Sequence, residues 1–290
     1  MRRTMLFLPG NSPAMLLNGD TLGSDSIILD LEDAVSPAEK DAARILVRNA
    51  IKYLNYHNSE VIVRINPLDT DYWKKDLDEI IPLKPSMIMP TKVSGADYIR
   101  EVDAYITEIE ERCGMEKNTV KLIPLIETTL GIENAYQIAT ASERVTAMFL
   151  GGEDLTADLH CVRTKEGTEI FYSRCRMVTA ARAAGIEVYD TPFTDVDDDE
   201  GLIKDAQFAK SLGFSGKAAI SPRHVHDINR VFSPTEAEVA YAHEVFEAIE
   251  TAKAQGRGVI SLHGKMIDAP IVSRARQVLE MDKAINGGAN

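Results

Sequence analysis

Short apolar stretches rich in Ile, Leu, Val and Met recur along the chain, and longer segments of mixed character separate them. They lie at residues 4–10, 26–32, 60–66, 87–93, 121–128, 145–152, 187–193 and 216–222. Most are almost continuously apolar rather than alternating, which is typical of parallel strands buried on both faces. We therefore predict eight strands linked by helices.

The segments between these strands carry helix-start signals. After the second strand, Ser36 fits an N-cap, Pro37 the first helical position and Glu39 the partner of a capping box. Ser233 and Glu236 repeat the arrangement around another proline near the end of the chain. Both sites predict helices that begin directly after the cap.

Eight strands that alternate with helices fit an α/β fold of the (β/α)8 TIM-barrel type, which we predict for residues 1–232. Periodicity alone leaves a doubly wound open sheet as an alternative. For residues 233–290 we predict a C-terminal helical extension, with a Gly-containing loop after residue 254 and a short terminal helix. This lid-like segment is expected to pack on the barrel or on a neighbouring subunit.

The composition limits the partners and the compartment. Lys and Arg number 32 against 45 Asp and Glu, and the resulting net charge of −13 argues against nucleic-acid and anionic-membrane binding. No stretch approaches the roughly 20 apolar residues of a membrane span, and the N-terminal apolar run is too short for a signal peptide. Cys113, Cys161 and Cys175 are widely spaced, without a CxxC pair, so we expect no disulfide framework or thiolate metal site. The sequence predicts an acidic cytoplasmic protein.

Charged residues stand at the ends of several predicted strands. In a barrel these ends gather at one mouth, which is where barrel enzymes place their chemistry. The residues concerned are Glu32 and Asp33, Arg64, Lys92, Glu127, and Glu153 with Asp154. Because burying an unpaired charge is costly, we expect these side chains to meet one another, a metal ion or a charged ligand.

Glu127 and Asp154 are the candidate metal ligands. Two carboxylates without a nearby His or Cys suit a hard cation such as Mg²⁺, which keeps water and open positions for substrate oxygens. Each carboxylate also fits the N-cap of the helix that follows it, so the pattern leaves both roles open. Glu32 and Asp33 are expected either to hydrogen-bond water on the metal or to cap the next helix.

Three further features of the mouth suggest ligand contacts. Arg64 lies inside an apolar strand, where its guanidinium would bind a ligand carboxylate bidentately or pair with Glu32 or another carboxylate at the mouth. Gly151 and Gly152 let the backbone approach a ligand and offer amide N–H groups to an oxyanion. Lys92 is either a Schiff-base nucleophile or a balancing charge.

Common catalytic motifs of other enzyme classes are absent. The chain has no GxSxG elbow, no GxxxxGK[ST] phosphate loop, and no GxGxxG after its first strand. Serine hydrolases, P-loop enzymes and Rossmann-type cofactor enzymes therefore lose most of their support.

Several segments, taken together, resemble the citrate lyase beta-subunit family, within the wider HpcH/HpaI aldolase group that includes citramalyl-CoA and malyl-CoA lyases. They include ILDLEDAVSPAEKDAAR, VIVRIN, LIPLIETTLGIENA, FLGGEDLTADL, LGFSGKAAISPRHV and GKMIDAP. The likeness runs in order over essentially the whole chain. Several motifs in the family's order are more specific than any one alone.

This resemblance implies a commonly trimeric (β/α)8 barrel that cleaves a 3-hydroxyacyl thioester with Mg²⁺. The family's metal-binding residues fall on Glu127 and Asp154, and its substrate-carboxylate arginine falls on Arg64. Its catalytic aspartate, delivered from a neighbouring subunit, falls on Asp268, although the residues alone suggest an N-cap for the last helix near Pro270. We expect the substrate to lie against Arg64, Glu127, Gly151, Gly152 and Glu153.

The implied reaction converts citryl-acyl-carrier protein into acetyl-acyl-carrier protein and oxaloacetate. The implied partners are the acyl-carrier-protein (gamma) and transferase (alpha) subunits of citrate lyase, in addition to other copies of this chain. A free-standing lyase that acts on citramalyl-CoA or malyl-CoA is the alternative within the same chemistry. A non-catalytic binding subunit is the alternative from another class.

Overall fold

The computed structural model describes residues 1–254 and 261–287. The chain divides into two compact units, one formed by Arg2–Arg230 and the other by Val231–Asn290 together with Met1. We describe each unit by itself. The Gly-containing loop expected directly after residue 254 lies outside the described residues.

The first unit contains a nine-stranded parallel sheet, and every predicted strand position is confirmed. Its strands are β1 (Thr4–Pro9), β2 (Ser26–Asp30), β3 (Glu60–Arg64), β4 (Met87–Met89), β5 (Lys121–Leu122), β6 (Leu125–Ile126), β7 (Ala147–Leu150), β8 (Glu187–Asp190) and β9 (Gly216–Ala219). The stretch predicted as one strand at 121–128 is divided into β5 and β6 by Ile123 and Pro124. Because proline has no N–H group to donate to a neighbouring strand, Pro124 accounts for the position of this division.

The sheet is curled, and its strand order is β5-β4-β3-β2-β1-β9-β8-β7-β6. Neighbours in the sheet are neighbours in the chain except where β1 pairs with β9. The predicted α/β class is therefore confirmed. All these pairings are parallel, as the continuous apolar stretches predict, and all five residues of β2 are buried.

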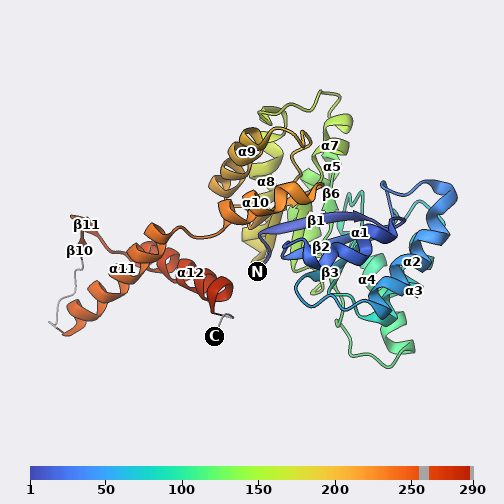
Figure 1. Ribbon diagram of the computed structural model, residues 1–290, viewed down its shortest axis with the longest axis horizontal. Helices are drawn as coiled ribbons and strands as arrows, with labels where there is room; N and C mark the ends of the chain where they lie inside the picture. The colour runs from blue at the N-terminus through green and yellow to red at the C-terminus, as the bar shows by residue number, and fades with distance from the viewer. Residues whose placement is uncertain (255–260, 288–290) are drawn as a thin grey trace. The chain divides into compact units, whose positions relative to one another are not determined.

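Helices lie around the outside of the strands (Figure 1). The α-helices of the first unit are α1 (Pro13–Asn18), α2 (Lys40–Tyr53), α3 (Trp73–Ile80), α4 (Ala96–Arg112), α5 (Thr129–Glu133), α6 (Ala135–Ala139), α7 (Gly152–Asp158), α8 (Phe171–Ala184) and α9 (Asp199–Leu212), and α10 (Val225–Phe232) leads into the second unit. The 3₁₀ turns are η1 (Gly19–Thr21), η2 (Pro37–Glu39), η3 (Ile81–Leu83), η4 (Thr168–Ile170) and η5 (Pro222–His224). Inside the sheet, side chains from successive strands form one buried cluster that includes Met5, Ile28, Ile62 and Phe149.

The two predicted capping boxes are wrong in detail. Ser36 precedes the 3₁₀ turn η2, its hydroxyl donates to the Glu39 carboxylate at 3.1 Å, and α2 begins only after this turn. Near the C-terminus the reciprocal bonds join Thr235 and Glu238, because each backbone N–H donates to the other side chain. The sequence has Ser or Thr at both positions, and only the path of the backbone selects between them.

The second unit is a pair of helices with its own small core. Helices α11 (Glu236–Ala254) and α12 (Ala269–Asn286) pack together beside a hairpin of β10 (Ser261–Leu262) and β11 (Lys265–Met266). The buried residues of this core are Ala242, Val245, Ile267 and Ala275. Across both units, no helix in the described part of the chain is long and apolar enough to cross a bilayer.

Gly216, the first residue of β9, has no room for a side chain, because the backbone just before β1 lies against it. A Cβ atom there would lie 2.2 Å from the carbonyl oxygen of Arg2 and 2.6 Å from that of Arg3. We therefore expect Gly216→Ala to lower the free energy of unfolding by about 1–3 kcal/mol. Denaturant unfolding of Gly95→Ala provides the control, because a Cβ there meets no atom within 4 Å. Equal stability of the two variants would contradict the expectation.

Candidate active site

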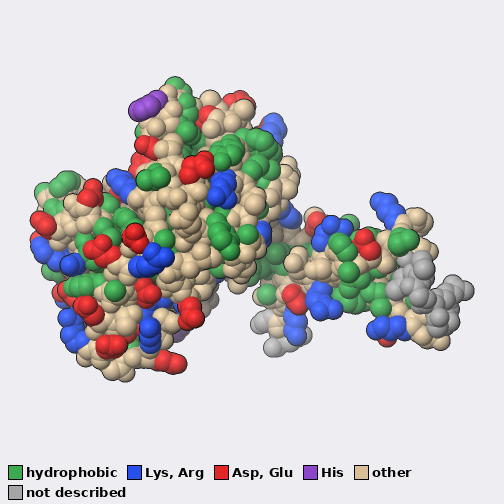
Figure 2. Space-filling view, turned by 180° about the vertical axis from the view of Figure 1, so that it is seen from behind, with side chains coloured by type: hydrophobic (Ala, Val, Ile, Leu, Met, Phe, Trp, Pro, Cys, Tyr) green, Lys and Arg blue, Asp and Glu red, His purple; other side chains and the backbone are tan. Residues whose placement is uncertain are grey.

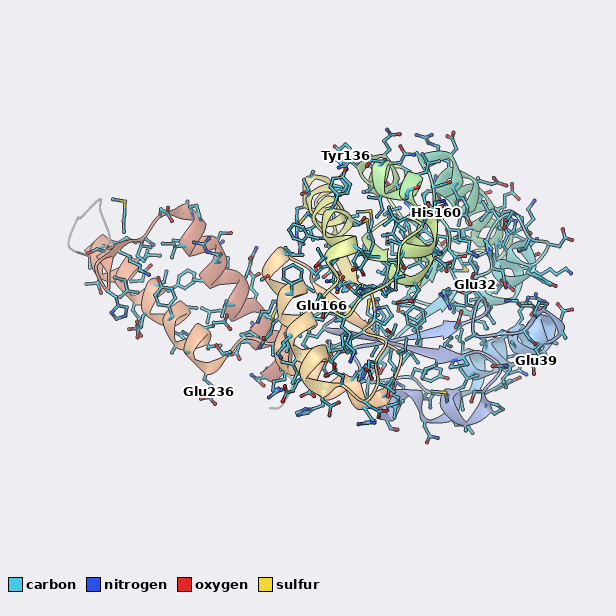
Figure 3. The ribbon with its side chains drawn as sticks, turned by 90° about the horizontal axis from the view of Figure 1, so that it is seen from above. Glu32, Glu39, Tyr136, His160, Glu166 and Glu236 are labelled. Atoms are coloured by element: carbon cyan, nitrogen blue, oxygen red, sulfur yellow. The ribbon has the colours of Figure 1, made fainter. Side chains whose placement is uncertain are left out.

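A cavity of about 400 Å³ lies at the carboxyl ends of the strands. Its walls include most of the polar side chains that the sequence pointed to, namely Arg64, Glu127, Glu153 and Asp154. In Figure 3, Glu32 lies in the interior of the first unit, whereas Glu39 and Tyr136 lie at its rim. The structure therefore gathers charge at the end of the sheet where parallel-strand enzymes hold their ligands.

Glu127 follows β6 directly, and its side chain is almost fully buried, with 4% of the residue exposed. The backbone N–H of Lys92 donates to its Oε1 atom at 2.8 Å. Burial, and secondarily the charge of Asp154, raise the pKa of Glu127 to about 8. A carboxylate in such a setting needs either a proton or a nearby cation.

Asp154 lies in the first turn of α7 and is half-buried beside the same cavity. Together with Glu127 it offers the oxygen ligands that Mg²⁺ prefers. Within residues 1–254 and 261–287, no group of three or more His, Cys, Asp or Glu side chains is placed to hold a metal ion. A cation held by this pair would therefore take its other ligands from water and substrate, which is the usual behaviour of Mg²⁺.

Gly151 and Gly152 line the cavity, and their amide N–H groups are bonded within the protein rather than free for an oxyanion. The N–H of Gly151 donates to the Ile126 carbonyl at 3.0 Å, and that of Gly152 donates to the Thr191 hydroxyl at 2.9 Å. A Cβ atom on Gly151 would lie 2.6 Å from the Cβ of Glu127, and one on Gly152 would lie 2.7 Å from Thr191 Oγ1. The glycines therefore leave room for their neighbours, while their donors are already used.

Arg64 forms an ion pair with a carboxylate that the sequence analysis did not single out. Strands β2 and β3 pair so that Asp30 lies directly opposite Arg64. The arginine donates from Nε to Asp30 Oδ1 at 2.7 Å and from Nη2 to Oδ2 at 2.5 Å. Its Nη1 atom lies 3.3 Å from Glu32 Oε2, and the guanidinium stacks over the Phe7 ring at 4.9 Å. The salt-bridge alternative is thus realised, while the rest of the guanidinium still lines the cavity.

Burial opposes the charge of Arg64, but Asp30, Glu32 and Asp33 raise its pKa above the ordinary value. The arginine therefore remains a cation at the cavity wall. Glu32 behaves differently. Burial raises the pKa of its carboxyl group to about 7, although the positive charge of Arg64 acts to lower it. This carboxylate accepts a bond from the backbone N–H of Asp33, whose own side chain is exposed at the cavity.

Lys92 lies beside these groups in a loop with a left-handed backbone, at φ 54°. Its ammonium lies 3.6 Å from Glu32 Oε1. Burial works against the charge, but Glu32 and the other carboxylates raise the pKa of Lys92. A Schiff-base nucleophile needs a lowered pKa, so this setting favours the balancing-charge interpretation.

The two remaining predicted residues occupy different surroundings. Glu153 lies at the cavity with an exposed side chain, 3.6 Å from Arg163 Nε. Asp268 belongs to the second unit, where it is the N-cap of α12 and its carboxylate accepts the Ile271 N–H at 3.2 Å. The capping role that the residues suggested for Asp268 is confirmed.

Sequence reasoning missed Asp30 and Thr191. Asp30 directly follows the apolar residues Ile27, Ile28 and Leu29, so its position carried the same signal as Glu32 two residues later. Thr191 follows β8 and lines the cavity, but a single threonine after a strand gives no distinctive pattern. Only the pairing of the strands reveals that these two side chains hold Arg64 and Gly152.

Comparison with known proteins gives a consistent assignment. The profile of the family described as HpcH/HpaI aldolase/citrate lyase matches residues 3–222. The citrate lyase subunit beta of Leuconostoc mesenteroides subsp. cremoris is 44% identical over 98% of this chain and 94% of its own length. The L-malyl-CoA/beta-methylmalyl-CoA lyase of Cereibacter sphaeroides is 34% identical over 98% of this chain and 95% of its own length.

A solved structure agrees with these relatives. It is described as a citrate lyase beta subunit from Mycobacterium tuberculosis complexed with oxaloacetate and magnesium. It superimposes on this chain with a TM-score of 0.68 and 28% sequence identity, over 80% of this chain and 97% of its own.

The raised pKa of Glu127 gives a prediction about stability and pH. Its ordinary pKa is 4.5, so between about pH 4.5 and pH 8 the folded protein binds more protons than the unfolded chain. The free energy of unfolding should therefore fall by a few kcal/mol as the pH rises through this window in EDTA. Glu127→Gln, which keeps the acceptor for Lys92, should show a smaller fall in denaturant titrations at pH 5 and pH 8. Added Mg²⁺ should restore stability in the wild type alone, and equal pH dependence in both proteins would refute the assignment.

Proposed function

Because this chain belongs to the HpcH/HpaI aldolase/citrate lyase family, we propose that it is the Mg²⁺-dependent lyase that cleaves citryl-acyl-carrier protein to acetyl-acyl-carrier protein and oxaloacetate. The lyase class rests on the family match and on the similarity to citrate lyase beta subunits. The single observation that carries the residue roles is the presence of Glu127, Asp154 and Arg64 around one cavity.

Glu127 and Asp154 would hold the Mg²⁺ ion. When bound, the ion supplies a Lewis acid for the hydroxyl and carboxylate oxygens on the tertiary carbon of the citryl group. Burial and the charge of Asp154 favour a proton on Glu127 in the metal-free protein, and Glu127 would release that proton if it held a divalent cation. The M. tuberculosis neighbour described with magnesium and oxaloacetate supports this choice of ion and ligand.

Arg64 would bind a carboxylate of the oxaloacetate half. Asp30 holds one edge of the guanidinium through Nε and Nη2, which fixes the orientation of the side chain. The Nη1 atom, which lies 3.3 Å from Glu32 Oε2, and the second N–H of Nη2 form the other edge, which keeps N–H groups that can bind a carboxylate end-on. Stacking on Phe7 restricts the guanidinium further. The arginine is thus positioned before substrate arrives.

The reaction breaks the bond between the tertiary carbon and the methylene group next to the thioester. The hydroxyl gives its proton to water and becomes the keto group of oxaloacetate, while the bonding electrons remain on the thioester fragment as an enolate. Uptake of one proton converts this enolate into the acetyl thioester. We propose that Asp268 supplies that proton, or removes it in the reverse direction. Its carboxylate lies at the start of α12, in the segment that the resemblance assigns to a neighbouring subunit.

The strand pairing supports a closed (β/α)8 barrel as the finer description of the fold. The two ends of the sheet order, β5 and β6, are separated in the chain only by Ile123 and Pro124. The Ile123 N–H donates to the Ile88 carbonyl at 3.0 Å, and the Phe149 N–H donates to the Pro124 carbonyl at 2.9 Å. We infer that β5 and β6 act as one strand, which joins the two edges. Residues 233–290 then form a separate C-terminal domain.

We propose that this chain works in a complex with the other citrate lyase subunits, as the beta-subunit name of its relatives implies. The partners would be the acyl-carrier-protein (gamma) and transferase (alpha) subunits, with the chain itself trimeric and cytoplasmic. On the face shown in Figure 2, Lys and Arg side chains lie among Asp and Glu side chains. An acidic carrier protein docking on a chain of net charge −13 needs such local basic side chains.

The malyl-CoA lyase relative supports a second candidate function. In that case the same metal ligands and Arg64 would act on malyl-CoA or citramalyl-CoA, and only the acid and the thiol carrier would differ. A non-catalytic subunit has less support, since a binding protein has no need of a buried and a half-buried carboxylate of the metal-binding type beside an oriented arginine.

Cleavage assays on the purified protein test the proposal. We expect oxaloacetate release from a citryl thioester in the presence of Mg²⁺ and its loss in EDTA, because the carboxylate pair needs the cation. Citramalyl-CoA and malyl-CoA, assayed alongside, should be cleaved more slowly. If one of these two thioesters were cleaved faster, the proposed substrate would be wrong while the proposed mechanism would still hold. Failure to cleave any thioester, with carrier protein and transferase subunit supplied, would contradict the proposal.

The Asp268 proposal needs variants that separate acid–base chemistry from helix capping. Asp268→Asn keeps a good N-cap for α12 but removes the titratable carboxylate, whereas Asp268→Ala removes both. We expect both variants to bind Mg²⁺ and oxaloacetate like the wild type and to lose turnover by at least roughly a hundredfold. Near-normal turnover in Asp268→Asn, with a loss only in Asp268→Ala, would leave Asp268 as a cap alone.

A further inference from the structure

Thr191 carries a hydroxyl group that the protein leaves half satisfied. The residue is fully buried at the end of β8, and it lines the cavity that holds Glu127 and Asp154. Its Oγ1 atom accepts the N–H of Gly152 at 2.9 Å. The hydroxyl proton has no acceptor among the described residues. A buried donor without a partner is unfavourable, so the cavity is suited to a ligand that accepts this hydrogen bond.

Donors are scarce around this cavity. Among the described residues that line it, only Arg64 and Thr191 have side chains with hydrogen-bond donors. The other polar lining side chains are carboxylates, and the amides of Gly151 and Gly152 are already bonded. For its side-chain donors, a ligand rich in carboxylate oxygens therefore depends on Arg64 and on Thr191.

A buried network fixes the position of Thr191. Strands β8 and β9 pair with Asp190 opposite Lys217, and the Lys217 ammonium lies 2.6 Å from Asp190 Oδ2. The same ammonium donates to the Thr191 carbonyl at 2.6 Å and lies 2.6 Å from Asp205 Oδ2. Arg174 bonds both Asp190 and Asp205, so two cations face two anions in a buried cluster. The backbone of Thr191 is thus held before any ligand binds.

The chemistry of oxaloacetate matches the free donors, and this inference rests on the proposed function. Oxaloacetate has a keto group, a carboxylate beside it and a second carboxylate one carbon further away. A divalent cation held by Glu127 and Asp154 would supply positive charge for the keto oxygen and the nearer carboxylate. The second carboxylate must then find its donors on the cavity wall.

We propose that the Thr191 hydroxyl donates a hydrogen bond to this second carboxylate, together with Arg64. Thr191 is then a specificity-determining residue, which distinguishes a dicarboxylic keto acid from a monocarboxylic one such as pyruvate. Its bond from Gly152 orients the hydroxyl so that the proton is directed away from α7. The bond to a charged acceptor contributes more than a neutral one would.

Calorimetric titration of oxaloacetate and of pyruvate at fixed Mg²⁺ tests the proposal. Pyruvate shares the keto acid group but lacks the second carboxylate. For Thr191→Val we expect the Kd of oxaloacetate to rise roughly tenfold or more, while the Kd of pyruvate changes less than about twofold. Thr191→Ser keeps the hydroxyl and should keep oxaloacetate binding within about threefold of the wild type.

The control separates hydrogen bonding to the ligand from a disturbance of α7. Thr156 is a buried threonine on α7. Its hydroxyl donates to the Gly152 carbonyl at 3.0 Å, and the residue does not line the cavity. If Thr156→Val reproduces the effect, or if Thr191→Val weakens oxaloacetate and pyruvate equally, the donor role is wrong. If the wild type itself binds no oxaloacetate with Mg²⁺, the proposed function fails before any variant is compared.

Discussion

The burial of one carboxylate is the constraint around which this site is arranged. Glu127 is almost without solvent, and the charge of Asp154 lies close enough to raise its pKa further. Gly151 provides the space that the Glu127 side chain fills, and the Lys92 N–H provides its one short backbone bond. A proton or a cation must complete the site, which links the fold of the strand ends to metal-dependent chemistry.

The fold was largely readable from the sequence because parallel strands leave a strong signal. Each apolar stretch became a strand, and Pro124 accounts for the one stretch that appears as two. Helix starts were less predictable, since Ser233 and Thr235 are both able to cap and the turn geometry decides between them. Whether a parallel sheet closes into a barrel depends on strand tilt and stagger, which no local pattern encodes.

For the site, the sequence predicts which residues carry charge at the strand ends, but not what those side chains contact. Glu127, Asp154 and Arg64 were identifiable because charges at the ends of apolar strands are uncommon and expensive. What each side chain contacts depends on how the strands pair, and that information is not local. The pairing of β2 with β3 places Asp30 opposite Arg64, and the position of Thr191 against Gly152 removes an amide that seemed available. Which side chains bond to one another within a crowded polar site is therefore known only from the three-dimensional structure.

The four charges behind Thr191 have a consequence for how this protein can change over time. Lys217, Arg174, Asp190 and Asp205 balance one another in a region almost without solvent. Loss of any one leaves a buried charge uncompensated, at a cost of about 3–5 kcal/mol, which is a large part of the stability of an ordinary domain. Viable lineages would have to exchange these positions in charge-matched pairs or keep all four. Substitutions on two strands and two helices are therefore coupled through this cluster. The cavity wall next to it is accordingly expected to change slowly in sequence.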